Sequence, residues 1–347
     1  MKKLLVVRND KLGDFMLVWP ALAMLRYSAL DWHITALVPH YTESLARYCP
    51  YIDDIIIDAG KNADKAAQRA TLAEIKKAKF DASINFFSDS YNALTVFKAG
   101  IPLRVAPATK FIQFLYNQRI TQRRSRSLKP EYEYNLDLAR AFLTKQGITI
   151  RELPPPYLSF PSDVLAQQRQ KLVQQLHISA DCPWVFVHAG SGGSANNLSL
   201  DQYAKLVNAI LKDTTVTVVL TAGPGETEKA QQLQAKVQST MNHRVVIYDK
   251  NDGLVDFAQS LACASVFIAG STGPLHICGA LNIPTIGFYP SKRSATPLRW
   301  QTTNQADKRL AFAPAPGAGT EDDLTTIDMN EVIKASLPFI QQHILAL

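Results

Sequence analysis

The chain has 347 residues, which is too long for one ordinary hydrophobic core and fits two domains of typical size. A hydrophobic fraction of 47% and a charged fraction of 19% exclude a mainly disordered chain, and no apolar run reaches the roughly 18 residues that span a bilayer. Residues 1–160 hold 23 Lys and Arg against 15 Asp and Glu, whereas residues 161–347 hold 14 against 15. The basic first half predicts an anionic partner, such as a membrane, a phosphorylated glycan or a nucleic acid.

Short β-rich apolar runs alternate with amphipathic stretches, a pattern typical of parallel sheets covered by helices. In the first half we predict strands at Leu4–Val7, Ile34–Val38, Ile55–Ile57, Ala82–Phe86 and Arg104–Ala106. We predict one helix from about Asp14 to Tyr27, a second that follows the strand Ile34–Val38 and extends through Leu45, and a third over Ala66–Ala78. The first run follows two lysines as in a signal peptide. Arg8 and Asp10 interrupt it, however, and no cleavage site follows, so we expect a cytoplasmic protein.

The proline-rich residues 152–163 predict a linker, after which the pattern restarts. In the second half we predict strands at Trp184–His188, Val216–Thr221, Val245–Tyr248, Val266–Ala269 and Thr285–Phe288, with helices at Ser199–Leu211, Glu226–Ser239 and about Met329–Leu345. We place the domains at residues 1–157 and 158–347 and expect the amphipathic last helix to be able to pack back on the first. Two doubly wound halves in series place a ligand cleft outside the carboxyl ends of both sheets.

The four cysteines carry no metal or redox signal. They are widely spaced, at Cys49, Cys182, Cys263 and Cys278, and match no zinc or disulfide-exchange pattern. We expect free thiols that behave as small hydrophobes.

The turn after the first strand, residues 8–14, is not the GxGxxG dinucleotide fingerprint, which argues against an NAD enzyme. Gly13 permits close approach of the backbone, and Asp14 follows where the helix begins. An aspartate at this place is commonly an N-cap, and spacing alone favours that interpretation. The alternative is a carboxylate at the mouth of the cleft that takes a proton from a substrate hydroxyl.

Two turns of the second half offer groups that bind a nucleotide. After Trp184–His188, the backbone N–H groups of small residues and the hydroxyls of Ser191 and Ser194 are suited to a pyrophosphate, and Ser199 with Gln202 forms a capping-box pattern. Glu226 follows the next strand. It either accepts hydrogen bonds from a ribose or complements a helix dipole.

The turn at residues 270–276 opens an apolar helix. The N–H groups of Thr272 and Gly273 would point at an anion there, and Pro274 suits a first helical turn. His276, one turn further on, is either a core histidine or a residue that faces the ligand.

The order of these turns resembles that of family 9 glycosyltransferases, the lipopolysaccharide heptosyltransferases. Its most specific part is Ser271-Thr272-Gly273-Pro274-Leu275-His276, followed by Gly279-Ala280-Leu281 and Ile283-Pro284-Thr285, and the resemblance covers nearly the whole chain. It implies the GT-B fold, in which an N-terminal acceptor-binding and a C-terminal donor-binding Rossmann-like domain face each other across a cleft. It also implies an inverting, metal-independent transfer of heptose from ADP-heptose to the inner core on lipid A, without a cofactor.

The resemblance also implies roles for individual residues. Asp14 would be the general base that deprotonates the acceptor hydroxyl, which reverses the N-cap interpretation. Glu226 would bind the ribose. The whole implied donor-binding set is Gly190, Ser191, Gly192, Asn196, Glu226, Ser271, Thr272, Gly273 and His276. Hydrogen-bond donors in this set would stabilise the departing diphosphate in place of a metal, and no DxD motif stands in these turns.

Two positions depart from the family pattern. Asn196 stands where the family commonly has a lysine, for which Lys292 or Arg293 is a possible replacement. Ser271 stands where the family often has an aspartate, which is a possible contact to the sugar. Heptose is the expected sugar, and another nucleotide-linked sugar is the alternative.

The expected acceptor-binding set is Lys11, Gly13, Arg119, Arg123, Arg124 and Arg126. A basic stretch is most often a solvated loop, whereas the resemblance implies contact with an anionic, Kdo-bearing lipid at the cytoplasmic face of the inner membrane. The stretch lacks the interleaved aromatic residues that single-stranded nucleic acid requires, so no nucleic acid is expected. A protein acceptor and a non-catalytic nucleotide-sugar binding protein are left open.

Overall fold

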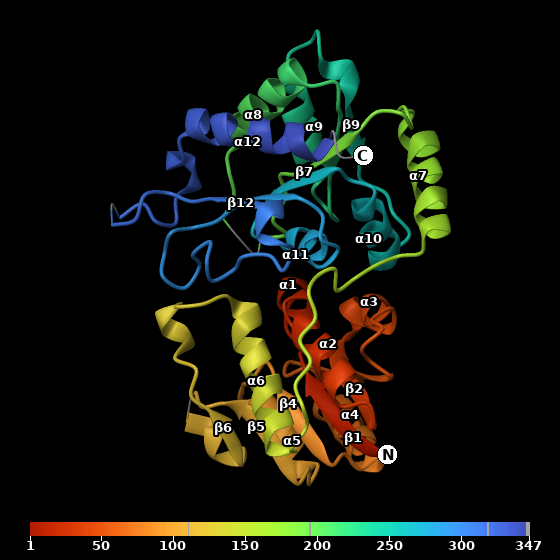
Figure 1. The fold of residues 1–347 in the computed structure, drawn as a ribbon, viewed down its shortest axis with the longest axis vertical. Helices are drawn as coiled ribbons and strands as arrows, with labels where there is room; N and C mark the ends of the chain where they lie inside the picture. Colours follow the sequence, from red (N-terminus) through yellow and green to blue (C-terminus); the bar gives the residue numbers. More distant parts are fainter. Residues whose placement is uncertain (110, 194–195, 318, 345–347) are drawn as a thin grey trace. The chain divides into compact units, whose positions relative to one another are not determined.

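The computed structural model describes residues 1–109, 111–193, 196–317 and 319–344. The chain divides into two compact units (Figure 1). The first comprises Met1–Arg124 and Lys129–Pro154, and the second Ser125–Leu128 and Pro155–Leu347. Each unit is built on a parallel sheet covered by helices, so the predicted α/β class is confirmed.

The described residues of the first unit form a six-stranded, fully parallel sheet in the order β3-β2-β1-β4-β5-β6. The strands are β1 (Lys2–Val7), β2 (Trp32–Pro39), β3 (Asp54–Asp58), β4 (Ala82–Asn85), β5 (Leu103–Pro107) and β6 (Gln118–Ile120). The helices are α1 (Leu12–Met16), α2 (Trp19–Ser28), α3 (Glu43–Arg47), α4 (Lys65–Ala78), α5 (Ser90–Lys98) and α6 (Glu131–Lys145). The chain reverses direction across the sheet between β1 and β4, the switch point where such sheets bind ligands.

The alternation of side chains along each strand gives the first sheet two buried faces. On one face, Ile75 of α4 and Val96 of α5 belong to the same core cluster as Leu37 of β2. On the other, the Phe142 ring of α6 meets the Trp32 ring edge-on, with centroids 5.0 Å apart. Both faces are therefore covered, as a fully parallel sheet requires.

The first predicted helix, from about Asp14 to Tyr27, is two helices. α1 ends at Met16 and α2 begins at Trp19. Pro20 accounts for the interruption because it has no N–H to donate to the carbonyl of Met16. The short α1 thus becomes a separate element directly after β1.

The second unit repeats the strand order of the first. Its described strands form a parallel sheet β12-β11-β10-β7-β8-β9, so that its switch point lies between β7 and β10. The strands are β7 (Trp184–His188), β8 (Thr217–Thr221), β9 (Val245–Tyr248), β10 (Val266–Gly270), β11 (Thr285–Phe288) and β12 (Arg309–Phe312). The helices are α7 (Ser162–Leu176), α8 (Leu200–Asp213), α9 (Thr227–Ala235), α10 (Leu254–Ala262), α11 (Gly273–Ala280) and α12 (Met329–Ile344).

The last helix, α12, packs against α8, and Val332 and Ile340 lie in the core of the second unit. The predicted end of this helix, Leu345, lies outside the described residues. The predicted capping box at the start of α8 is confirmed, since Ser199 and Gln202 bond each other's backbone N–H groups.

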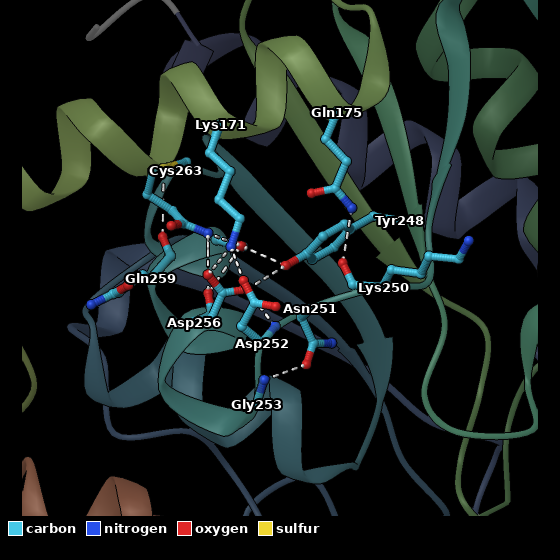
Figure 2. Close-up of polar contacts among 12 residues, drawn as sticks. Lys171, Gln175, Tyr248, Lys250, Asn251, Asp252, Gly253, Asp256, Gln259 and Cys263 are labelled. Carbon is cyan, nitrogen blue, oxygen red and sulfur yellow. Dashed lines mark hydrogen bonds and ion pairs between the residues drawn. The ribbon is translucent and has the colours of Figure 1, made fainter.

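A polar cluster fastens α7 to α10 in the second unit (Figure 2). The Lys171 ammonium lies 2.6 Å from carboxylate oxygens of both Asp252 and Asp256. Gln168 donates to Asp256 at 3.1 Å, and the Asp252 N–H donates to it at 3.0 Å. Burial would raise the pKa of Asp256, but these donors and the Lys171 charge hold it below the ordinary value. The cluster therefore joins α7, the helix that follows the proline-rich segment, to α10.

Candidate functional site

Arg8 is the central group at the switch point of the first sheet. It follows β1, is 4% exposed, and forms ion pairs with Asp14 (Nη2–Oδ1, 2.6 Å) and Asp10 (Nε–Oδ1, 2.8 Å). It also lies 4.0 Å from the Glu131 carboxylate of α6 and donates at 3.1 Å to the carbonyl of Phe86, just after β4. Burial would lower the pKa of Arg8, but the three carboxylates raise it. A buried, permanent cation thus ties the ends of two strands to the predicted base.

Asp14 does not cap a helix, so the N-cap interpretation is wrong. The N-cap of α1 is Lys11, and Asp14 lies inside the first turn, where its side chain pairs with Arg8. The carboxylate is held by one strong partner and remains 17% exposed. Lys11 is exposed and Gly13 half-buried on the same turn. The geometry permits Asp14 to accept a proton, and its role as the base stays a prediction.

Asp10 is a second carboxylate on this turn, which sequence reasoning did not single out. Burial raises the pKa of Asp10 to about 6, although the Arg8 charge opposes that shift and Asp14 adds to it. Asp10 and Asp14 share one guanidinium, so protonation of Asp10 leaves Arg8 with one carboxylate fewer. Neither Arg8 nor Asp10 carries a signal in sequence that distinguishes it from an ordinary loop charge.

In the second unit, Glu226 connects the turns that follow β7 and β8. It occupies the N-cap position of α9, but one carboxylate oxygen accepts from the N–H groups of Ser191 and Gly192, both at 2.8 Å. The other oxygen accepts from the N–H of Gly223 at 3.0 Å. Burial would raise the pKa of Glu226, but these donors and His188 hold it below the ordinary value. The amides that the resemblance assigns to the donor pyrophosphate are therefore bound to Glu226 in this structure.

The close approach of Glu226 depends on Gly190. A Cβ at that position would lie 2.0 Å from a Glu226 carboxylate oxygen. Asn197, which sequence reasoning missed, fastens the same loop. Its amide donates to the carbonyls of Ala189 and Gly190 at 2.9 and 3.0 Å, and its oxygen accepts from Tyr203 at 2.6 Å. Gly190 thus makes room for a side chain of the protein itself.

The turn after β10 has an unpartnered polar group. Thr272 is the N-cap of α11, is 4% exposed, and its hydroxyl has no hydrogen-bond partner among the described residues. Gly273 is the first residue of α11, and Pro274 lies in its first turn as predicted. His276 is buried one turn further on, and Ser271 is half-buried. A buried hydroxyl without a partner at a helix N-terminus is suited to an anionic ligand.

Asn196 and Lys292, two residues considered for the donor site, both contact Asp322. The Asn196 amide donates to its backbone carbonyl at 2.7 Å, and the Lys292 ammonium lies 3.0 Å from its carboxylate. Lys292, the suggested replacement for the family lysine, is therefore held by an acidic partner, while Arg293 is exposed. Asn196 and Lys292 come together although 96 positions separate them in the chain.

The basic residues of the predicted acceptor set have different environments. The Arg124 guanidinium lies 2.6 Å from the Glu131 carboxylate and over the ring of Tyr134, so it is bound to side chains of the first unit itself. Arg119 and Arg123 are exposed in the first unit. Arg126 is exposed in the short segment Ser125–Leu128 of the second.

The part of the chain that the structure describes contains no group of three His, Cys, Asp or Glu side chains that could hold a metal ion. Its four cysteines are free, as predicted. Within the same residues, every helix is too short or too polar to cross a bilayer.

Comparison with known proteins identifies the family. The profile of glycosyltransferase family 9 (heptosyltransferase) matches residues 69–314. A Haemophilus influenzae protein, whose description as a glycosyltransferase is provisional, is 53% identical over 341 residues, which cover 98% of this chain and 97% of that protein.

Solved structures of the family share the fold. The family 9 glycosyl transferase of Veillonella parvula covers 98% of this chain and 97% of its own, with a TM-score of 0.79 and 16% identity. The structure of Escherichia coli ADP-heptose LPS heptosyltransferase II matches over 99% of this chain and 99% of its own, with a TM-score of 0.75 and 17% identity. The structure of E. coli heptosyltransferase WaaC with ADP matches over 98% of this chain and 99% of its own, with a TM-score of 0.72 and 16% identity. The two doubly wound units thus have the GT-B type of fold, and the chain belongs to glycosyltransferase family 9.

Proposed function

We propose that this glycosyltransferase transfers heptose from ADP-heptose to the inner core of lipopolysaccharide, with inversion and without a metal. The observation that carries the proposal is the ion pair between Asp14 and the buried Arg8. It fixes a partly exposed carboxylate at the switch point of the first sheet, where a general base must be placed and oriented. The family match and the similarity to two E. coli heptosyltransferase structures support the choice of sugar.

In this mechanism Asp14 takes the proton of the acceptor hydroxyl as that oxygen attacks the anomeric carbon of the donor. Arg8 keeps the carboxylate in place through the 2.6 Å ion pair between its Nη2 and the Asp14 Oδ1. The leaving ADP carries negative charge. The hydroxyl of Thr272 and the N–H groups at the start of α11 would stabilise it, which is the role a metal has in other transferases.

The proposed acceptor is an anionic lipid A–Kdo glycolipid at the cytoplasmic face of the inner membrane. Exposed Arg119 and Arg123 on the basic first unit support it. A second candidate is another nucleotide-linked sugar as donor. Ser271 and Asn196 favour this alternative, because they stand where the family commonly has aspartate and lysine.

Transfer from ADP-heptose to heptose-deficient lipopolysaccharide tests the proposal, with the product measured by mass. We expect transfer in the presence of a chelator and a fall of about 10²- to 10⁴-fold in Asp14→Asn, the usual contribution of a positioned base. The matched control is Asp31→Asn, the same change at an exposed carboxylate of the first unit. Undiminished transfer by Asp14→Asn would show that Asp14 is not the general base. If other nucleotide sugars served as donors and ADP-heptose did not, heptose would not be the transferred sugar.

A further inference from the structure

Charge and exposed aromatic surface coincide in one segment of the first unit. Residues 90–124 contain no Asp or Glu, but six basic residues: Lys98, Arg104, Lys110, Arg119, Arg123 and Arg124. Among the phenylalanines, which all lie in the described part of the chain, those that are exposed also fall in this segment: Phe97, Phe111 and Phe114, at 48%, 90% and 58%. Exposed aromatic rings in a segment whose charged residues are all basic require an explanation, since folded domains normally bury large aromatic side chains.

These side chains come from two neighbouring elements. Leu94, Phe97 and Lys98 are spaced i, i+3 and i+4, so they share the exposed face of α5. The 3₁₀ helix Phe111–Leu115 packs against α5. Its residues Ile112 and Leu115 face the core, whereas Phe111 and Phe114 project outward with ring centroids 5.6 Å apart.

Arg104 joins the two elements. Its guanidinium lies over the Phe97 ring at 5.4 Å and donates at 2.8 Å to the carbonyl of Leu115, the last residue of the 3₁₀ helix. Phe97 and the Phe111–Phe114 pair are thus parts of one fixed surface.

Arg119 lies on the same side of the sheet. In the parallel register of β5 and β6 it pairs with Ala106, so the two side chains point to the same face. Ala106 packs in the core cluster that contains Val96 of α5. Its neighbour Gln118 points the other way and bonds α6. We call Leu94, Phe97, Lys98, Phe111, Phe114 and Arg119 the aromatic–basic surface.

We propose that the aromatic–basic surface is a docking site for an anionic lipid bilayer. Exposed phenylalanine and leucine side chains insert at the boundary of headgroups and acyl chains, and flanking Lys and Arg bind anionic headgroups. Charge complementarity supports this occupant, because residues 90–124 carry basic residues and no Asp or Glu. A nucleic acid fits less well, since the Phe111 and Phe114 rings are edge-to-face at 70° and Leu94 offers no stacking surface. The proposal deepens the proposed function by naming the surface that brings the enzyme to a lipid acceptor.

Sedimentation with vesicles tests the proposal with the full chain. The probes are vesicles of phosphatidylcholine alone and of phosphatidylcholine with phosphatidylglycerol, neither containing an acceptor. We expect binding to the anionic vesicles only, weakened by salt, and a loss of about tenfold or more in Phe111→Ser/Phe114→Ser. The matched control is Leu30→Ser, which removes a 70% exposed apolar side chain elsewhere on the first unit and should bind like the wild type.

A second variant, Lys98→Glu/Arg119→Glu, should also lose binding to anionic vesicles while leaving the fold intact, as checked by circular dichroism. Wild-type binding by Phe111→Ser/Phe114→Ser, or equal loss in Leu30→Ser, would overturn the proposal. Binding of a single-stranded oligonucleotide that both double variants abolish, without vesicle binding, would assign the surface to nucleic acid instead. Transfer to a water-soluble acceptor fragment reports separately on the proposed function, because that assay contains no membrane.

Discussion

The carboxylate of Glu226 accepts a hydrogen bond from the backbone N–H of Ser191, 35 positions earlier in the chain, at 2.8 Å. Gly192 and Gly223 donate to the same carboxylate, so this one side chain satisfies amides of two loops at the end of the second sheet. The turn rich in small residues is thus organised by an acidic side chain of the protein itself.

Replacing Glu226 by Gln should therefore destabilise the protein by about 1–3 kcal/mol, because an amide cannot accept from all three N–H groups. The free energy of unfolding in urea measures this. Gly190→Ala should act through the same contact, since its Cβ would displace the carboxylate, so the double variant should lose less than the sum of the two. Glu228→Gln, on the same helix but exposed, is the control and should be nearly neutral. Additive losses would show that the two positions are independent.

Arg8 should not tolerate lysine. A lysine ammonium cannot reach Asp10, Asp14 and the Phe86 carbonyl at once, as the planar guanidinium does. We expect Arg8→Met to lose about 3–5 kcal/mol of unfolding free energy, because the largely buried carboxylates of Asp10 and Asp14 lose this ion-pair partner, and Arg8→Lys to lose less. Arg47, which is exposed and pairs with Glu43, supplies the control, Arg47→Lys, with a change of about 0.5 kcal/mol or less. Equal effects at the two positions would contradict the central role of Arg8.

Asp10 should give the protein an unusual dependence on pH. Its folded-state pKa of about 6 lies above the ordinary value of 3.8, so the folded protein binds this proton more tightly than the unfolded chain does. The stabilisation is complete below pH 3.8 and is lost as pH rises through 6. The difference in unfolding free energy between wild type and Asp10→Asn should therefore change between pH 4 and 6 and be constant above pH 7. Urea unfolding across this range measures it, and a constant difference throughout would show that the pKa is not raised.

Asp256 should behave in the opposite way. Its pKa is lowered, so its stabilisation is present above the ordinary value of 3.8 and is lost as pH falls through the folded-state pKa. At neutral pH, Asp256→Asn should cost about 1.5–3 kcal/mol, as expected for charged hydrogen bonds that hold α7 to α10. Asp201→Asn breaks an exposed pair with Lys236 and should cost little. Thermal unfolding of both variants and the wild type, at pH 7 and at a pH well below 3.8, measures these losses. The loss in Asp256→Asn should be smaller at the lower pH.

Strands of the central sheets could be predicted from sequence because each is a continuous apolar run between turns. Trp184–His188 was predicted with the bounds that the structure has. The edge strand at Gln118–Ile120 could not be predicted, since three residues, two of them polar, carry no periodic signal. The helices Ser90–Lys98 and Glu131–Lys145 were also missed, because polar residues such as Asn92 and Asn135 are buried in them and obscure the apolar stripe.

Only part of the candidate site could be predicted from the sequence. Asp14 and Glu226 could be predicted because they lie in turns after buried strands, and parallel sheets bind ligands at the carboxyl ends of their strands. Their partners could not be identified in the same way. Arg8 interacts with Glu131 across 123 positions, and a sequence gives no measure of that proximity. The inward direction of Glu226 likewise depends on Gly190, whose importance is steric and appears only once the two loops lie side by side.

Strand order has a consequence for how the chain acquires its structure. β1 lies in the middle of its sheet, and both of its neighbours, β2 and β4, come later in the chain. During synthesis the first residues to leave the ribosome must therefore wait until residue 85 has emerged before both edges of β1 are paired. Such non-local pairing slows folding and leaves the apolar Leu4–Val7 exposed in the meantime. Deleting residues 1–8 would remove the central strand of the first sheet and Arg8 together, so the amino terminus is an unsuitable place to shorten this protein.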